Sequence, residues 1–310
     1  MRAHTRSHTS RESAFDLSAE APRSITIFPL RGGSIQARIY EPEGAIHGNV
    51  LIHSATACPQ RFYEAFAKHL ARGGLRVFTY DYRGIGASRG RTLRGEKVTM
   101  ADWAQIDARA LHEYIARNYP EQRLALVGHS FGGQLIGLLD EARAVSAAVF
   151  VGAQFGYYGY WPRERAAQLR RIWKFLVPAL SHTLGYVPKR AGIGEDLPRG
   201  VALQWARWCS HPDYLVSEFP SARARYARFD RPILAYSFSD DDIAPERAVE
   251  ALYSELVSAP VTHRKLSPDQ LGVSSVGHFG FFRKRTGAAL WDEAREFLID
   301  SVRETHSGAA

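Results

Sequence analysis

A serine flanked by glycines stands where an apolar strand-like run meets the start of an apolar helix-like run. The segment Leu124–Val127 leads into Gly128, Ser130 and Gly132, and the apolar residues 134–139 follow. A serine held in a tight turn at such a junction is exposed at the edge of a sheet, and glycines two positions away leave room for the turn. We therefore predict that Ser130 is a nucleophile and that the Phe131 amide, at the helix start, donates a hydrogen bond to an oxyanion.

The same pattern occurs a second time around Ser88, between Gly86 and Gly90. Residues 91–96, which follow it, begin no apolar helix, so the context rejects Ser88 as a nucleophile. Gly84 and Gly86 also follow a strand-like run, but no third glycine has the right spacing and no helix opens there. The segment therefore does not fit a dinucleotide-binding loop.

A serine nucleophile needs a base to take its proton and an acid to hold that base. The apolar run 232–236 leads into three consecutive carboxylates, Asp240, Asp241 and Asp242, each of which is also a candidate cap for the helix that follows. Among twelve histidines, His278 lies between two glycines in a loop after the last expected strand. That position allows an imidazole to reach back over the sheet edge, so His278 is the expected base.

The elements that must position these residues alternate between buried strands and amphipathic helices. A hairpin is expected from residues 25–30 and 35–40, followed by buried strands at 49–53, 75–80, 123–128, 145–152, 232–237 and 261–266. Helical periodicity is seen at 62–70, 103–115, 246–257 and 288–302. This order predicts an α/β protein with a mostly parallel, doubly wound sheet.

The alternation breaks between residues 157 and 229, where we expect helices and no strand. Four of the six tryptophans lie there. We expect a flexible tail at 1–23, a core formed by 24–156 and 230–303, and a helical cap inserted at 157–229, between the sixth and seventh strands. The cap aromatics suggest an apolar acyl or aromatic binding surface, although each of them also suits ordinary packing.

Composition sets wide limits on the class of protein. The chain has 310 residues, 45% of them hydrophobic, a net charge of +8 and only two cysteines, Cys58 and Cys209. We expect a globular cytoplasmic protein without disulfides, metal or cofactor and without a transmembrane segment. Residues 157–200 hold eight basic and three acidic side chains. A solvated basic face explains this excess, and an anionic substrate or a membrane surface remains open.

The whole stretch from about residue 24 to 302 resembles the α/β-hydrolase superfamily, which uses the chain order Ser, Asp, His. The resemblance implies Ser130 as nucleophile, His278 as base and Asp241 as acid, because Pro245 follows Asp241 by four residues as is common in the superfamily. The segments 51–56 and 81–88 are similar to its oxyanion loop and to its Asp-x-Arg-Gly-x-Gly-x-Ser motif. With Ser54 in place of the usual glycine, the resemblance implies Ala55 as the second oxyanion amide. The chain is most similar to serine aminopeptidases and monoacylglycerol-lipase-like hydrolases.

These residues favour a serine hydrolase that cleaves a small-molecule carboxylic ester through an acyl-enzyme intermediate. Amide or peptide cleavage and acyl transfer with the same triad remain alternatives. A peptidase of this kind needs free carboxylates in its cap for an N-terminal ammonium, and Glu164, Glu195 and Asp196 are few among many arginines. A non-catalytic ligand-binding module and a charge-driven binder of nucleic acid or membranes are the alternatives from other classes; we expect no nucleic acid partner.

Overall fold

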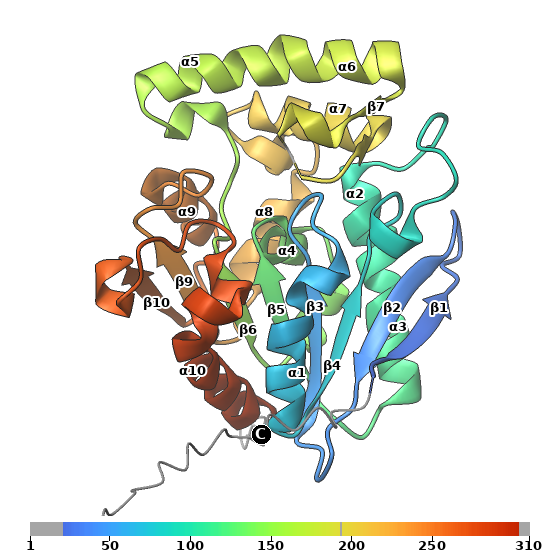
Figure 1. Cartoon of the computed structure of the whole chain (residues 1–310), viewed down its shortest axis with the longest axis vertical. Helices are drawn as coiled ribbons and strands as arrows, with labels where there is room; N and C mark the ends of the chain where they lie inside the picture. The colour runs from blue at the N-terminus through green and yellow to red at the C-terminus, as the bar shows by residue number, and fades with distance from the viewer. Residues whose placement is uncertain (1–20, 193, 304–310) are drawn as a thin grey trace, which may run out of the picture.

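An eight-stranded sheet forms the centre of the computed structural model, which describes residues 21–192 and 194–303 (Figure 1). The strands lie in the order β1-β2-β4-β3-β5-β6-β9-β10. Their bounds are β1 Arg23–Ile27, β2 Ile35–Tyr40, β3 Gly48–His53, β4 Leu75–Tyr80, β5 Leu124–His129, β6 Ala148–Val151, β9 Ile233–Phe238 and β10 Val261–Leu266. The β1–β2 hairpin is antiparallel and also pairs antiparallel with β4, whereas all other neighbours are parallel. The predicted α/β class and mostly parallel sheet are confirmed.

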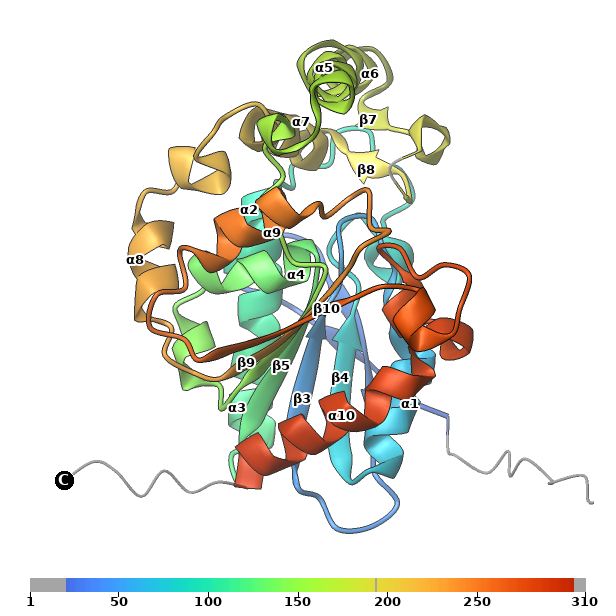
Figure 2. The ribbon, with the colours of Figure 1, turned by 90° about the vertical axis from the view of Figure 1, so that its left-hand side faces the viewer.

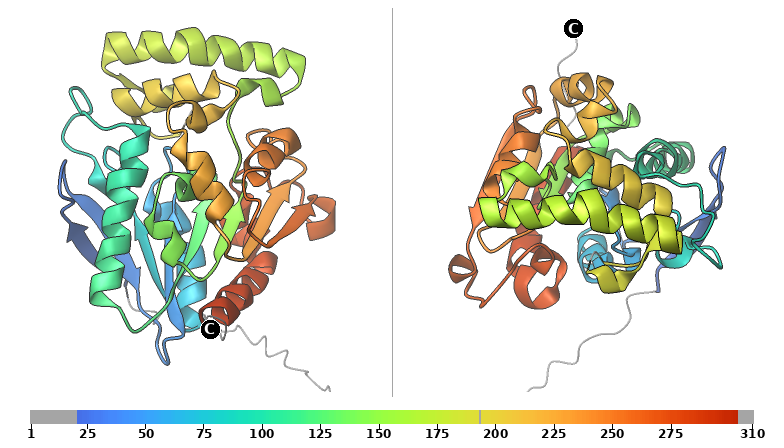
Figure 3. Two further views of the ribbon diagram at one scale, coloured as in Figure 1. Left: turned by 180° about the vertical axis from the view of Figure 1, so that it is seen from behind. Right: turned by 90° about the horizontal axis from the view of Figure 1, so that it is seen from above.

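Both faces of the sheet are covered, which is why its central strands are apolar without interruption. In β3, Leu51 packs into one core cluster while its neighbours Val50 and Ile52 pack into the other. Helices α1 (Glu64–Arg72) and α10 (Lys284–Arg303) cover one face, and α3 (Arg109–Asn118) lies on the other (Figures 1 and 3). Helix α9 (Glu246–Tyr253) follows β9, as the periodicity predicts.

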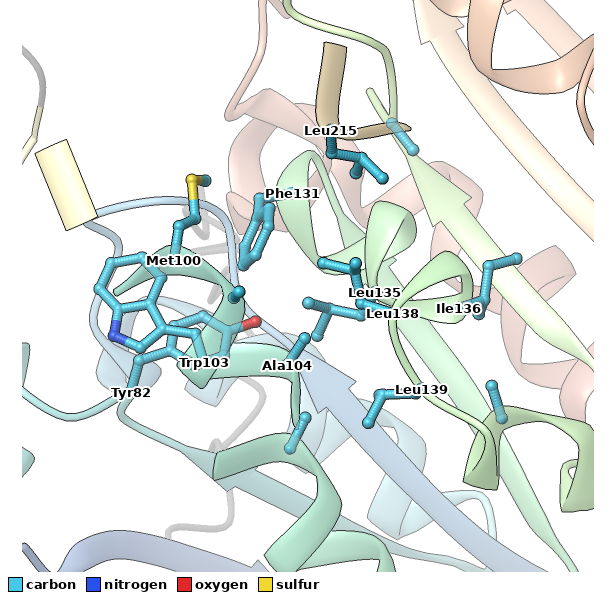
Figure 4. Close-up of a cluster of buried hydrophobic side chains, with 14 of the residues drawn as sticks. Tyr82, Met100, Trp103, Ala104, Phe131, Leu135, Ile136, Leu138, Leu139 and Leu215 are labelled. Carbon is cyan, nitrogen blue, oxygen red and sulfur yellow. The ribbon is translucent and has the colours of Figure 1, made fainter. Parts of the chain in front are cut away.

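The helix predicted at 103–115 begins earlier and contains a wider turn. Thr99 and Asp102 form a capping box, α2 covers Met100–Asp102, and a π-helical turn over residues 103–108 leads into α3. The Trp103 ring is fully buried and stacks on Tyr82 at 4.7 Å between ring centroids. Figure 4 shows these two rings beside Phe131, the residue after Ser130, so this cluster supports the turn that carries the expected nucleophile.

The helix that follows Ser130 is shorter than predicted. Helix α4 covers only Phe131–Gln134, and a 3₁₀ turn continues to Gly137. Tyr226 explains the early end, because its Oη donates to the Gln134 carbonyl at 2.6 Å. An α-helix would use that carbonyl for the Leu138 amide, which instead donates to the Leu135 carbonyl.

The segment between β6 and β9 is mainly helical. Its elements are α5 Arg163–Arg171, a π-helical turn Ile172–Leu176, α6 Val177–Leu184, α7 Arg199–Cys209 and α8 Ser221–Arg228. The expectation that it contains no strand is wrong in detail, because β7 (Tyr186–Val187) and β8 (Leu197–Pro198) pair antiparallel. Helices α5 to α7 lie above the carboxyl ends of the strands (Figures 1 and 2), whereas α8, which carries Tyr226, packs beside the sheet against the segment after Ser130.

The predicted tail at residues 1–23 falls mostly outside the described residues. Strand β1 already begins at Arg23, so the last position of the expected tail belongs to the sheet. Both cysteines are buried and free. No helix in the described part of the chain is long and apolar enough to cross a membrane.

Candidate active site

The backbone at Ser130 has the strained geometry that the sequence pattern predicts. Ser130 has φ 54° and ψ −115°, a region that residues other than glycine rarely adopt. The flanking glycines are required by close backbone contacts. A Cβ at Gly128 would lie 2.6 Å from the Gly133 backbone, and one at Gly132 would lie 2.1 Å from the His53 carbonyl oxygen. The turn therefore holds Ser130 at the carboxyl end of β5.

Asp241 and His278 meet at the same edge of the sheet. His278 Nδ1 and Asp241 Oδ2 are 2.7 Å apart, and the two side chains are only 3% and 1% exposed. The other oxygen, Asp241 Oδ1, accepts from the Ile243 and Ala244 amides, both at 2.9 Å. The carboxylate thus orients the imidazole so that Nδ1 donates to it and Nε2 is left to act as a base.

The two neighbouring carboxylates have other environments. Asp240 accepts from the Val276 and Gly277 amides at 2.8 and 3.0 Å and so binds the loop that carries His278. Burial raises the pKa of Asp240, but hydrogen bonds, including those from the two amides and the Ser275 hydroxyl, together hold that pKa below its ordinary value. Asp242 is exposed. Of the three carboxylates that the sequence left open, only Asp241 contacts His278.

Ser130 and His278 both lie against the backbone at the end of β6. The Ser130 amide donates to the Val151 carbonyl at 2.9 Å, and the imidazole of His278 lies over the next residue, Gly152. A Cβ at Gly152 would be 3.1 Å from that ring, and the φ of +55° there also favours glycine. No hydrogen bond joins Ser130 Oγ to His278 within residues 21–192 and 194–303. Such catalytic bonds are often long in unliganded enzymes and shorten with substrate.

His129, the residue before Ser130, faces away from the serine and links two loops. Its Nε2–H donates to the His278 carbonyl at 2.9 Å, and its Nδ1 lies 2.9 Å from Tyr63 Oη. Burial and the nearby His278 lower the pKa of His129 well below its ordinary value, so the ring is neutral and Nδ1 accepts from the Tyr63 hydroxyl. The sequence does not single out Tyr63, because no motif or spacing distinguishes an aromatic residue next to a helix start as part of a site.

The prediction for Ala55 is wrong in this structure. The Ala55 amide donates to Tyr63 Oη at 2.8 Å, so it points into the protein and is not available to an oxyanion. The oxyanion loop is also strained two residues later, where Ala57 has φ 57°. The Phe131 amide remains the predicted donor, at the first position of α4.

Ser88, which the sequence context rejects as a nucleophile, has a structural role. Its hydroxyl donates to the Asp81 carbonyl at 2.7 Å and accepts from the Gln36 amide at 2.8 Å. The Asp81 carboxylate accepts from the Ala87 amide and from Gln60, and a Cβ at Gly86 would lie 2.5 Å from it. This motif therefore ties the turn after β4 to the β1–β2 hairpin and the start of α1.

Two acidic side chains on the side of the insertion that faces the core are already paired with core residues. Glu195 contacts Arg61 at 2.9 Å and accepts from the Gly86 amide at 3.1 Å, and Asp196 pairs with Arg89 at 2.9 Å. Glu164 is exposed on α5. These contacts fasten the insertion to the core beside the oxyanion loop.

A cavity of about 800 Å³ borders Asp241 on the β9–β10 side. Trp161 and Arg165 of the insertion line it together with His263 and Lys265 of β10. Neither Ser130 nor His278 lines it. The cavity therefore reaches the acid and not the nucleophile, and we assign it no part in binding the reacting group.

Comparisons with known proteins agree with this fold. The family description "Serine aminopeptidase, S33" matches residues 45–195. A soluble variant of monoglyceride lipase from Saccharomyces cerevisiae, solved with a substrate analogue, has a TM-score of 0.66 at 14% identity, over 94% of this chain and 99% of that one. A monoacylglycerol lipase from Paleococcus ferrophilus has a TM-score of 0.58 at 15% identity, over 86% and 99%. The esterase Pf2001 from Pyrococcus furiosus has a TM-score of 0.56 at 15% identity, over 90% and 91%. No curated protein matches the sequence.

The sheet order, the strained serine turn and these matches define the class of protein. The chain has the α/β-hydrolase fold. Its residues 45–195 are similar to the serine aminopeptidase family. Among the described residues, no group of three or more His, Cys, Asp or Glu side chains is arranged to hold a metal ion.

Proposed function

We propose that the protein is a serine hydrolase that cleaves a carboxylic ester through an acyl-enzyme intermediate. The observation that carries the proposal is the buried pair of His278 and Asp241, 2.7 Å apart, at the sheet edge where Ser130 occupies its strained turn. A buried carboxylate that fixes the imidazole tautomer, at the same sheet edge as a serine in a strained turn, is the arrangement that activates a hydroxyl.

The reaction follows from the roles of these groups. Ser130 Oγ attacks the ester carbonyl while His278 Nε2 takes its proton, and Asp241 stabilises the imidazolium that forms. The Phe131 amide donates to the oxyanion. His278 then gives the proton to the leaving alcohol, and water, activated by the same imidazole, releases the acid and restores Ser130.

The cap favours esters over peptides with a free N-terminus. Binding of an ammonium needs an unpaired carboxylate near the pocket, but Glu195 and Asp196 are engaged by Arg61 and Arg89 and Glu164 is exposed on α5. We propose that α5 to α7, which lie above the strand ends, form a cap over an apolar acyl or aromatic group of the substrate.

A fluorophosphonate probe and a panel of short- to long-chain activated esters test the proposal. We expect the probe to label Ser130 and the Ser130→Ala variant to lose at least ~10³-fold in turnover. Ser88→Ala is the matched control, since this second Gly-x-Ser-x-Gly serine only holds a turn, and it should keep both label and turnover in correctly folded protein.

Two outcomes would contradict the proposal. One is Ser130→Ala protein that retains most of the esterase activity. The other is folded parent protein that takes up no fluorophosphonate and turns over no ester, which would instead favour a ligand-binding module.

A further inference from the structure

The longest helix of the insertion has an apolar face whose centre no other described residue covers. Residues 163–184 run continuously from α5 through the π-helical turn into α6. One face of this helix packs inward through Trp173 and Val177, which are 8% and 1% exposed. On the opposite side, Phe175 and Leu176 are 68% and 46% exposed. Single exposed apolar side chains are common, but a contiguous exposed apolar patch marks a surface that contacts something else.

These exposed residues form a regular stripe. Ile172, Phe175, Leu176 and Ala179 line one shallow groove and follow the spacing of i, i+3, i+4 and i+7, which places them on one face of a helix. We call these four residues the outer stripe. The helix thus has two apolar faces. The core and α7 pack on the inner one, and of the outer stripe only the half-buried Ile172 also touches the core cluster.

The outer stripe lies on the outermost element of the molecule. Figures 1 and 2 show α5 and α6 above all other helices and strands, and the view from above in Figure 3 shows them crossing the molecule as one straight rod. At 1.5 Å per residue the rod is about 33 Å long. A straight helix at the top of a molecule can lie along a flat surface without steric conflict from the rest of the fold.

The charges around the outer stripe are almost all positive. The helix carries Arg163, Arg165, Arg170, Arg171 and Lys174 against a single acid, Glu164. All five bases are exposed, and in the described part of the chain none of them forms a salt bridge. Arg171 lines the same groove as the outer stripe. Arg165 lines the cavity beside Asp241, whereas the other four cations are free to meet an anionic surface.

The charge decides between the possible occupants. A second copy of the chain would bring the five bases of one rod against the five of the other, and like charges at close range oppose such an interface. A basic helix with a narrow apolar face, Phe and Leu at its centre and arginines at its flanks, is the pattern of helices that lie in the interface of an anionic bilayer.

We propose that the outer stripe docks the protein on the surface of an anionic lipid bilayer, with residues 163–184 lying in the plane of the interface. Phe175 and Leu176 enter the boundary between headgroups and acyl chains, and Arg163, Arg170, Arg171 and Lys174 contact the lipid phosphates. The proposal does not depend on the proposed catalysis, and its test does not measure it.

Co-sedimentation with vesicles tests the docking of the full chain. We expect binding to vesicles of phosphatidylcholine with phosphatidylglycerol, little binding to phosphatidylcholine alone, and release as salt rises. Phe175→Ser combined with Leu176→Ser should lower the partition coefficient at least ~10-fold. Arg171→Gln and Lys174→Gln should each lower it about fivefold, which corresponds to about 1 kcal/mol per basic residue near the surface.

The chain offers a matched control in a second exposed Phe and Leu. Phe28 and Leu30, 79% and 102% exposed, lie at the β1–β2 turn next to α3 rather than on the insertion. Phe28→Ser combined with Leu30→Ser removes the same side-chain types and should leave the partition coefficient unchanged.

A fluorescent label reports the depth of the helix. Cys58 and Cys209 are buried, so an environment-sensitive thiol dye attaches selectively to a Phe175→Cys variant. We expect a blue shift of the dye on anionic vesicles and none for a Val257→Cys variant, whose native side chain is 74% exposed in the connection between α9 and β10.

Three results would overturn the proposal. They are absence of binding to anionic vesicles at low salt, equal binding by the parent and the Phe175→Ser, Leu176→Ser variant, and a parent that is dimeric in solution and becomes monomeric in that variant without binding vesicles. The last result would assign the outer stripe to an interface between copies.

Discussion

Tyr63 is the residue on which two loops of the candidate site depend. Its hydroxyl accepts from the Ala55 amide of the oxyanion loop and donates to His129, which in turn holds the carbonyl of His278. All three rings are buried. None of these bonds involves Ser130, so Tyr63 acts as a positioning residue for the groups that react.

Tyr63→Phe should destabilise the protein by about 1–3 kcal/mol, because a buried amide and a buried imidazole nitrogen lose their partner. It should also lower kcat more than it raises KM on an activated ester, since the loop that carries His278 loses a support that it receives through His129. Urea unfolding and steady-state kinetics measure the two effects.

Tyr40→Phe is the matched control, because the Tyr40 hydroxyl is buried and has no hydrogen-bond partner in the described structure. Its removal should be neutral or stabilising. Equal losses of stability and kcat in the two variants would contradict the role given to Tyr63.

At the scale of elements, the loop after β9 and the loop after β10 support each other. Asp240 binds the backbone of residues 276 and 277, and Asp241 binds the side chain of the next residue, His278. Two adjacent carboxylates therefore divide two tasks: one fixes where the loop runs and the other fixes how the imidazole is turned.

We expect Asp241→Asn to lower kcat about 10⁴-fold, because an amide favours the wrong imidazole tautomer. Asp240→Asn should lower kcat less. It should also speed amide hydrogen exchange in residues 275–279, whereas Asp241→Asn should not, because Asp240 binds the backbone of this loop. Asp242→Asn, at an exposed position, should leave both unchanged. A larger loss of kcat in Asp240→Asn than in Asp241→Asn would reverse the assignment.

At the scale of the whole molecule, the core contains a pair of histidines that the proposed reaction does not use. His53 Nε2 and His112 Nε2 are 3.3 Å apart with stacked rings, and Tyr80 Oη lies 2.7 Å from His53 Nδ1. Burial lowers the pKa of His112 to about 4, and burial together with His112 lowers that of His53 well below its ordinary value. Both rings are therefore neutral in the folded protein.

This pair predicts loss of stability in acid. The unfolded chain protonates His112 near its ordinary pKa of 6.5, whereas the folded protein does so only near 4. Stability from this residue is thus fully present above about pH 6.5 and is lost as the pH falls toward 4, by up to about 3 kcal/mol.

Urea unfolding at about pH 7.5 and about pH 5 measures this loss. The loss should be smaller in His112→Gln, which keeps a hydrogen-bonding side chain that does not titrate. His211→Gln, whose native side chain is 50% exposed, should show the full loss of the parent. The same pH dependence in all three proteins would contradict this account of the pair.

Local chemistry was sufficient to predict the class of fold and the position of the turn at Ser130. The position of a strand such as β10, at Val261–Leu266, depends on the alternation of apolar residues. The glycines around Ser130 depend on the space that the backbone leaves. Both are properties of residues that are neighbours in the chain. For the same reason the context of Ser88 was sufficient to reject it as a nucleophile, and its bonds to Asp81 and Gln36 give it a structural role.

Contacts between distant segments decided the rest. The direction of the Ala55 amide depends on Tyr63, the short α4 on Tyr226, and the choice among Asp240, Asp241 and Asp242 on where the loop of His278 lies. A hydrogen bond between residues far apart in the chain leaves no period or spacing in the sequence, because its partners become neighbours only when the sheet and its layers assemble. The sequence by itself therefore determined which chemical groups reach the sheet edge, and the tertiary structure determined how each is oriented there.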